Sequence, residues 1–271
     1  MKSLLTAFLI LFALPLHAQT GGDLADSRLH ALQTGDASRG WEAVGRLNMN
    51  GVGFCTATLI SETRVLTAAH CLFNGHTGDR IDPSQLEFLA GWRTGRAEAI
   101  RNVRRAVIWP GFDFAAGAAL TNVPTDIALL ELDRPIRTTG ITPFQVSTLL
   151  PERGERVAVV SYGRGRAEAP SIQETCHVLD QRRSGVSVFS CNIVPGSSGS
   201  PVFIVQDDAL RIISVISARA EDTETPVSLG MQLGPRIAAL HAQLDAGATG
   251  GAQQVSGALS GARSTARFLR P

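Results

Sequence analysis

The sequence lacks a strong excess of charge of either sign. Its 271 residues carry a formal net charge of +1, and only 18% of them are charged. Because a nucleic-acid-binding surface normally shows a marked basic surplus, this balance argues against nucleic acid as the main partner. The hydrophobic fraction of 44% is ordinary, and the length suits one large domain or two small ones with a well-buried core.

The sequence also lacks a hydrophobic run that could comfortably span a bilayer. The longest run, from Leu4 to Leu16, follows Lys2 and precedes the small residue Ala18. A basic start, a short apolar stretch and a small residue are typical of a secretory signal peptide. We therefore expect residues 1–18 to be a signal cleaved after Ala18, and the protein to be secreted or periplasmic without stable membrane insertion. A one-pass membrane anchor is the alternative.

Cysteines are few, but their number is even: Cys55, Cys71, Cys176 and Cys191. In an oxidising compartment four cysteines indicate two disulfides, and three pairings are possible. Pairing in sequential order closes two short loops and is the simplest of the three. A zinc site needs ligand spacings that these cysteines do not show. We expect no metal and no cofactor.

Helical periodicity is nearly absent from residue 41 to residue 234. Short apolar or alternating runs such as "GFCTATLIS", "RVAVVSYG" and "SPVFIV" follow one another, separated by Gly, Pro, Asn and Ser. This pattern is typical of an all-β barrel or sandwich. The exception is "PRIAALHAQLD" at 235–245, where apolar residues at helical spacing lie between Pro235 and Gly247. It predicts a C-terminal helix.

Two segments flank this region. Residues 19–39 are polar and Gly-rich without a sustained period, which predicts a pro-segment or flexible arm. Residues 246–271 are rich in Ala, Gly and Ser, a composition that predicts a disordered tail.

Two adjacent serines in "NIVPGSSGSPV", 192–202, raise the possibility of a nucleophile. A serine hydroxyl needs a base, and the base needs a third group to orient it. His70 closes the apolar run "VLTAAHC", and Asp126 opens "DIALLEL", which would carry its carboxylate inward, where an unpaired charge is costly. Taken alone, His70 is more often a structural histidine than a catalyst, and Asp126 can equally be a turn or strand-start residue. The chain order of His70, Asp126 and Ser198 is that of chymotrypsin-type triads.

The motifs "TAAHC", "DIALLEL" and "GSSGSPV", with "FCTATLI" one strand before the first, resemble those of the chymotrypsin/trypsin-like serine peptidases. The bacterial secreted branch that includes the glutamyl endopeptidases is the most similar. The resemblance covers residues 41–245, and we assign the peptidase domain to 40–245. It implies an all-β fold of two packed six-stranded antiparallel β-barrels with a C-terminal helix, and an active site in the cleft between the barrels.

The resemblance also implies roles for individual residues. Ser198 would be the nucleophile, His70 its general base and Asp126 the group that orients the imidazole. The backbone N–H groups of Gly196 and Ser198 would form the oxyanion hole, and a side chain at Gly196 would obstruct the approach to it. We therefore expect a monomeric serine endopeptidase that hydrolyses proteins or peptides through an acyl-enzyme. A catalytically silent binding protein on this scaffold, or an esterase with the same triad, is the alternative.

The cysteines fit the same frame. The resemblance implies that Cys55 pairs with Cys71 and staples the loop that carries His70. We expect Cys176 to pair with Cys191 and to anchor the strand that leads into the serine loop.

Ser197 departs from the family pattern, because animal trypsins carry an aspartate there that pairs with a newly cut N-terminal amine. That activation switch is absent in its usual form. The segment "SRGWEAVG" still resembles a mature start after Arg39, so removal of 19–39 would act through steric release or another amine contact.

The residues expected at the specificity pocket also depart from the family pattern. Asn192 stands where trypsins place their pocket aspartate, Ile193 follows it, and no acid occurs within 191–198. The histidine that glutamyl endopeptidases use on the strand beside the pocket is also missing. We expect Ser217 near the substrate backbone and Arg219 at the pocket mouth, or, alternatively, Arg219 as a surface strand-end residue. From these residues we expect the enzyme to prefer a small or medium uncharged residue before the cut bond. We expect modest acceptance of acidic residues there through Arg219, and poor cleavage after Lys and Arg.

Overall fold

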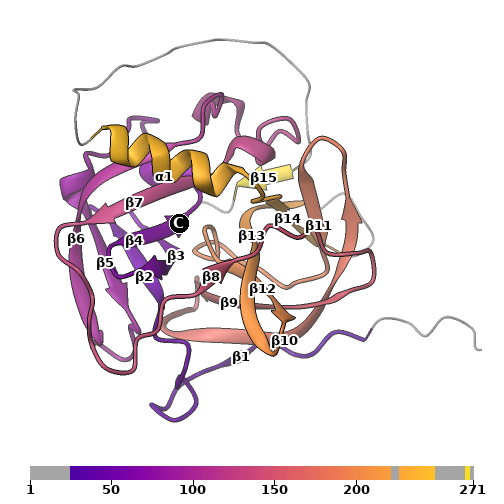
Figure 1. The fold of residues 1–271 in the computed structure, drawn as a ribbon, viewed down its shortest axis with the longest axis horizontal. Coiled ribbons are helices and arrows are strands. Elements are labelled where there is room, and N and C mark those ends of the chain that lie inside the picture. Colours follow the sequence, from indigo (N-terminus) through magenta and orange to yellow (C-terminus); the bar gives the residue numbers. More distant parts are fainter. Residues whose placement is uncertain (1–24, 221–225, 248–265, 269–271) are drawn as a thin grey trace, which may run out of the picture.

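A computed structural model describes residues 25–220, 226–247 and 266–268 of the chain. These residues form two β-barrels, with a single α-helix packed beside the first barrel (Figure 1). The signal expected at 1–18 and most of the tail expected at 246–271 lie outside the described residues. Within the described part, no helix is long and apolar enough to cross a membrane.

The first barrel is closed, and its six strands pair with antiparallel neighbours in the order β2-β3-β4-β7-β6-β5. Strand alternation directs residues such as Leu47 and Met49 inward, where both are buried. The strands are β2 (Val44–Met49), β3 (Phe54–Ser61), β4 (Arg64–Thr67), β5 (Leu86–Ala90), β6 (Ala99–Ile108) and β7 (Ala128–Leu132).

The second barrel follows the order β10-β11-β14-β13-β12-β9 and closes because β9 also pairs with β10. The expected pair of six-stranded antiparallel barrels is therefore confirmed. Its strands are β9 (Arg156–Gly163), β10 (Arg166–Gln181), β11 (Val186–Phe189), β12 (Pro201–Gln206), β13 (Ala209–Ala220) and β14 (Val227–Met231).

Short elements complete the described chain. The expected helix is present as α1 (Arg236–Ala246), and its buried residues Leu240 and Leu244 lie on the side that packs against β6 and β7 of the first barrel. The remaining strands are β1 (His30–Ala31), β8 (Gln145–Val146) and β15 (Ala266–Phe268). The 3-10 helices are η1 (Ala69–Leu72), η2 (Pro83–Gln85), η3 (Phe114–Ala116) and η4 (Val123–Thr125).

The N-terminal arm, residues 25–39, packs on the second barrel. Its strand β1 pairs with β10, Ser27 N donates to Thr175 O at 2.8 Å, and Leu32 is only 4% exposed. Residues 25–39 therefore contact the second barrel, because β10 offers an edge for β1 and the core accepts Leu32. Their expected role as a pro-segment or flexible arm stays a prediction.

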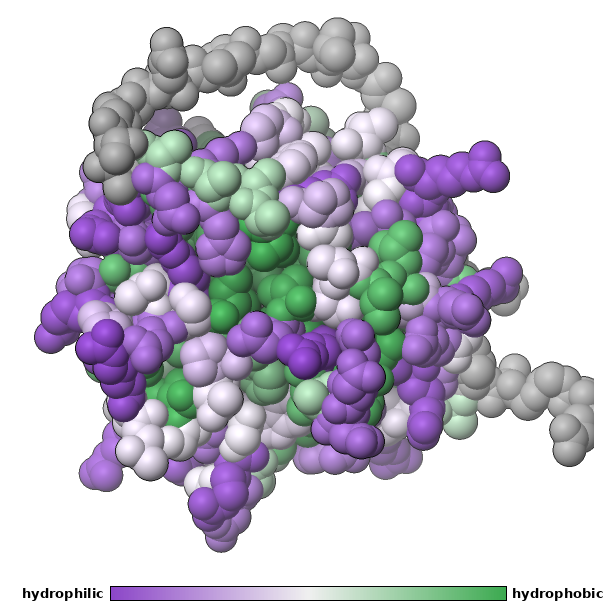
Figure 2. Space-filling model, in the orientation of Figure 1, coloured by the Kyte–Doolittle hydropathy of each residue, from purple (hydrophilic) through white to green (hydrophobic). Residues whose placement is uncertain are grey.

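Figure 2 shows that the face seen in Figure 1 is mainly hydrophilic, with hydrophobic side chains gathered near its middle.

Apolar residues also join the two barrels in the interior. Trp41 stacks at its edge on Phe203 of the second barrel, with ring centroids 5.4 Å apart, and Phe203 contacts Phe144. The core of the first barrel therefore continues into the second through Phe203, while a separate cluster that includes Val159 and Ile213 fills another part of the second barrel.

Candidate active site

Strand pairing brings His70 and Asp126 together. Strands β4 and β7 are antiparallel, with Thr67 opposite Ala128, so the chain leaving β4 and the chain entering β7 lie at the same barrel end. His70 follows β4 on η1, and Asp126 lies between η4 and β7. His70 Nδ1 lies 2.8 Å from Asp126 Oδ2. The first barrel alone therefore builds this pair.

The Asp126 carboxylate is fully buried and is satisfied by donors from both barrels. Its Oδ1 accepts a hydrogen bond from the backbone N–H of His70 at 2.8 Å. Its Oδ2 contacts His70 Nδ1 and also accepts from the hydroxyl of Ser217 on β13 at 2.5 Å. A buried charge needs such partners. With an acceptor at Nδ1, the neutral imidazole places its proton there and keeps Nε2 as a base.

The loop 196–200 is fixed between the two barrels by backbone contacts. Thr56 of β3 donates from its N–H to Ser198 O at 2.9 Å and from its hydroxyl to Gly196 O at 2.9 Å. On the other side, Gly199 N donates to Ile216 O at 2.8 Å. Both the nucleophile candidate and the oxyanion-hole candidates therefore sit on a doubly anchored loop.

Gly199 shows how closely this loop approaches the histidine-bearing strand. Its φ is +79°, and a Cβ there would lie 2.1 Å from Thr56 O and 2.2 Å from the Thr67 hydroxyl. Thr67 is the last residue of β4, which leads directly to His70. Only glycine allows this approach, which seats Ser198 next to the His70 segment.

Gly196 is constrained by its own backbone conformation and by Phe54. Its φ is +95°, and a Cβ would lie 2.5 Å from the Phe54 ring. This constraint adds to the expected one, that a side chain would obstruct the oxyanion hole, which stays a prediction. Among backbone hydrogen bonds of the described residues, none is donated by Gly196 N, so this N–H fits the oxyanion-hole role.

Arg166 is a site residue that the sequence did not reveal. Its guanidinium donates to the buried Ser197 hydroxyl at 2.9 Å, to the Ser161 hydroxyl at 2.8 Å and to Ser161 O. Burial lowers the pKa of Arg166 to about 10, so it stays charged at neutral pH. A cation from within the chain thus holds the serine loop at the position where animal trypsins use a new N-terminal amine.

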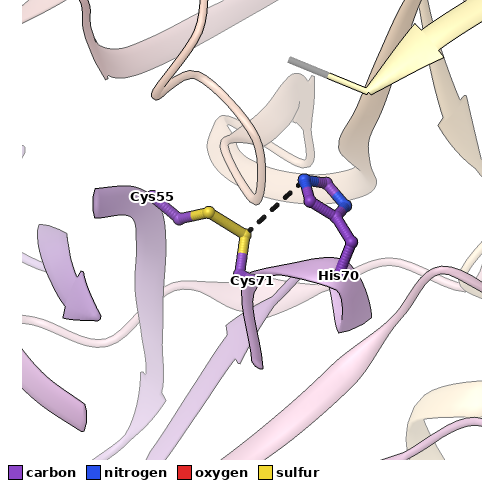
Figure 3. A group of neighbouring side chains, drawn as sticks. All are labelled: Cys55, His70 and Cys71. Atoms are coloured by element: carbon purple, nitrogen blue, oxygen red, sulfur yellow. Dashed lines mark hydrogen bonds between the residues drawn. A yellow bond between two sulfur atoms is a disulfide. The ribbon is translucent and has the colours of Figure 1, made fainter. Parts of the chain in front are cut away.

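Both expected disulfides, Cys55–Cys71 and Cys176–Cys191, are present. Figure 3 shows the first beside the imidazole, with Cys71 Sγ 3.9 Å from His70 Nε2. Although the ligand atoms of Cys55, His70 and Cys71 lie within 4.8 Å of one another, disulfide sulfurs lack the thiolate charge that binds metal. This group packs the histidine and does not offer a metal site.

Three of the four predicted pocket residues line a cavity of about 290 Å³. Asn192, Ile193 and Arg219 line it, whereas Ser217 points to Asp126 instead. The sequence missed Asp26, which enters from the arm. The lining consists of Asp26, Gln173, Ser190, Cys191, Asn192, Ile193, Arg219, Pro226 and Val227.

Asp26 is held in place at this cavity by two contacts. Its Oδ1 lies 2.8 Å from His177 Nδ1 and accepts from the Ser190 hydroxyl at 2.9 Å. No sequence motif marks this acid, since the arm is polar throughout and far from residues 190–193 along the chain. A larger cavity of about 740 Å³ between the arm and β9, β10 and β12 contains no triad residue.

Two barrels that contribute a histidine–aspartate pair from one side and a glycine-flanked serine loop from the other define the chymotrypsin-like class of peptidases. The chain belongs to the trypsin-like peptidase family, since residues 55–210 match the model of the trypsin-like peptidase domain.

Known relatives agree with this assignment. The chain is 34% identical over 90 residues to trypsin zeta of Drosophila erecta, covering 32% of this chain and 28% of that protein. It is 34% identical over 84 residues to a trypsin of Phaedon cochleariae, covering 31% and 29%. The matches thus span less than a third of these relatives. A Glu endopeptidase structure in complex with MPD shares the fold, with a TM-score of 0.65 at 15% identity over 82% of this chain and 99% of that one.

Proposed function

We propose that this chain is a secreted serine endopeptidase with His70, Asp126 and Ser198 as its triad. The observation that carries the proposal is the fully buried Asp126 carboxylate, 2.8 Å from His70 Nδ1. Family membership and the anchored loop of Ser198 support it.

In acylation, Ser198 Oγ attacks the scissile carbonyl carbon while His70 Nε2 takes the hydroxyl proton. The imidazolium is stabilised by the Asp126 carboxylate, which accepts hydrogen bonds from the backbone N–H of His70 and from the Ser217 hydroxyl. The carbonyl oxygen becomes an oxyanion, which accepts hydrogen bonds from the N–H groups of Gly196 and Ser198. His70 then gives its proton to the leaving amine, and the acyl group stays on Ser198.

In deacylation, a water molecule replaces the amine. His70 takes a proton from the water as it attacks the ester carbonyl, and the same two N–H groups stabilise the second oxyanion. His70 returns the proton to Ser198 Oγ, which releases the carboxylic acid product and regenerates the enzyme. No cofactor takes part in either step.

The cavity of about 290 Å³ is our proposed pocket for the side chain before the cut bond. It carries one acid, Asp26, and one base, Arg219. A charged substrate side chain of either sign meets one like charge there, which favours a small or medium uncharged residue. This keeps the poor cleavage after Lys and Arg expected from the sequence, but the charge of Asp26 makes cleavage after acidic residues weaker than the modest acceptance expected through Arg219.

The proposal includes export through the signal 1–18. It also keeps the arm 25–39 in the mature protein, since the arm forms part of the second barrel's sheet and brings Asp26 to the pocket. Protein or peptide substrates follow from the family.

A fluorophosphonate probe tests the function directly, because it reacts only with an activated serine. We expect one probe molecule on Ser198, found by peptide mass spectrometry, and no labelling of Ser198→Ala. Ser200→Ala is the matched control, since Ser200 is buried in the same loop and its hydroxyl lacks a hydrogen-bond partner in the described structure. Labelling at another residue, or none in folded protein, contradicts the proposal. Digestion of a peptide library separates a peptidase from an esterase or a binding protein.

A further inference from the structure

One edge of β13 changes partner along its length. Residues 209–215 pair with β12, which starts at Pro201. At Ile216 the partner is the serine loop, because Gly199 N donates to Ile216 O at 2.8 Å and Ile216 N donates to Ser200 O at 2.9 Å. The opposite edge of residues 216–220 pairs with β14. Beyond the serine loop, the first edge would be open.

The C-terminal strand β15 occupies that edge. It pairs antiparallel with β13, with Ala218 opposite Phe268, Arg219 opposite Arg267 and Ala220 opposite Ala266. Figure 1 shows β15 in yellow beside β13. The segment is therefore directly next to the loop that carries Ser198.

The direction of β15 matters for the chemistry. Because the pairing is antiparallel, the chain from Ala266 to Phe268 runs toward Ser217, which bonds to Asp126. An extended peptide that pairs with 218–220 in this direction delivers its following residues toward Ser198. Adding a strand to an open sheet edge is a common mode of peptide recognition.

We propose that the C-terminal strand Ala266–Phe268 occupies the edge on which a substrate peptide must pair, and so inhibits the enzyme competitively from within the same chain. This rests on the proposed function, because an edge beside Ser198 has a substrate only if the site is catalytic. Since the segment is tethered, its binding is intramolecular and acts at an effective concentration of about millimolar order. A substrate must displace it.

The test compares the full chain with a chain ending at Gly247 and with Arg267→Pro. Proline has no N–H and is disfavoured within a strand ladder. Arg263→Pro is the matched control, because it lies in the same tail but outside β15. Intact mass is checked for each protein, so that a trimmed tail is recognised.

We expect the truncated chain and Arg267→Pro to show a KM for an extended peptide about tenfold lower than that of the full chain, with kcat unchanged. Arg263→Pro should behave as the full chain does. A synthetic peptide of residues 260–271, added to the truncated chain, should raise KM without lowering kcat. Equal KM values for full and truncated chains, or equal effects of the two proline variants, would overturn the proposal.

Hydrogen exchange separates this proposal from the proposed function. It is measured on Ser198→Ala, which cannot process its own tail, with and without residues 248–271. We expect slower exchange of the β13 peptide containing 218–220 when the tail is present. If no variant cleaves any peptide, the proposed function fails, and equal exchange in the two forms then overturns the tail contact as well.

Discussion

The Ser217 hydroxyl donates a 2.5 Å hydrogen bond to Oδ2 of Asp126, the same oxygen that faces His70 Nδ1. Ser217 belongs to β13 in the second barrel, whereas Asp126 precedes β7 in the first. This hydrogen bond therefore fixes the position of one barrel relative to the other at the candidate active site. It also helps to stabilise the Asp126 carboxylate, which is inaccessible to solvent.

Replacing Ser217 with alanine should lower kcat/KM by about 10- to 100-fold, because a hydrogen bond to a buried charge contributes about 1.5–3 kcal/mol. Ser214→Ala is the control: Ser214 is equally buried on β13, but its hydroxyl bonds to Met231 O at 2.8 Å. Rates of peptide cleavage and of fluorophosphonate labelling should fall together for Ser217→Ala. Similar losses in both variants would show a general effect on the strand instead.

The anchor of Ser197 by Arg166 leads to a second prediction. Arg166→Ala should lower kcat by at least about 10-fold, since the loop 196–198 loses its cation and the N–H groups drift from the oxyanion position. The kcat of Arg166→Lys should lie between those of Arg166→Ala and the unaltered chain. Lysine keeps the positive charge but lacks the planar guanidinium with its several donors. Arg164→Ala, at a neighbouring exposed side chain, should retain activity. Full activity of Arg166→Ala would refute the anchoring role.

We expect the same anchor to make cleavage after Arg39 unnecessary for activity. Arg39 is exposed and pairs only with Asp36 among the described side chains, at 2.5 Å. We predict that Arg39→Gln is as active as the unaltered chain, and that N-terminal sequencing finds residues 25–39 in the active protein. An Arg39→Gln protein that stays inactive until the arm is removed would contradict this.

Glu131 on β7 gives a prediction about acid stability. Burial alone would raise the pKa of Glu131, but hydrogen bonds from Arg104 and Arg105 and the charge of Arg64 hold it below the ordinary value of 4.5. Arg64 Nη1 lies 2.9 Å from Glu131 Oε1. Because the native carboxylate binds a proton less readily than the unfolded one, its contribution is present above pH 4.5 and is lost as the pH falls through the native pKa.

Glu131→Gln should therefore lower the free energy of unfolding by about 1–3 kcal/mol at pH 7 and flatten its decline between pH 5 and pH 3. Urea unfolding at several pH values measures both effects. Glu62→Gln removes an exposed pair with Arg137, 2.7 Å apart, and should change little. Parallel pH curves for Glu131→Gln and the unaltered chain would show that Glu131 does not titrate as described.

The C-terminal helix was predictable from local periodicity, and an all-β fold from strand alternation and turn residues. The two six-stranded barrels and the choice among the three disulfide pairings depended on the resemblance of the short motifs to a known family. The strand β10 was harder. Pro170 and the polar residues around Gln173 interrupt the apolar pattern over its first half. Pairing with β9 and β1 on its two edges decides its conformation, and a local pattern does not show such partners.

Site residues far apart in sequence were missed for the same reason. Arg166 reaches Ser197 only because β9 and β10 turn back toward the serine loop, and nothing near Arg166 marks it as special. Asp26 reaches the pocket only because the arm adds a strand to β10. The expected place of Ser217 near the substrate backbone stays a prediction. The bond of its side chain to Asp126 was not foreseen, because this contact depends on the docking of the barrels.

The final prediction concerns the two charges of the proposed pocket. Asp26 and Arg219 both line the cavity of about 290 Å³, so each should select against a substrate charge of its own sign. On a peptide series that differs only before the cut bond, we expect uncharged residues to give kcat/KM values about tenfold above Lys, Arg or Glu, a difference of about 1.4 kcal/mol.

The variants separate the two contributions. Asp26→Asn should raise kcat/KM selectively for peptides with Glu before the cut bond. Arg219→Gln should instead raise kcat/KM for peptides with Lys or Arg there. Glu174→Gln is the control, because Glu174 is an exposed acid that lines the larger cavity and not this one. If Lys or Arg substrates exceed the neutral ones by tenfold in the unaltered chain, Asp26 dominates the pocket and Arg219 points away from the bound side chain. If neither variant changes the order of the series, the substrate side chain binds outside this cavity.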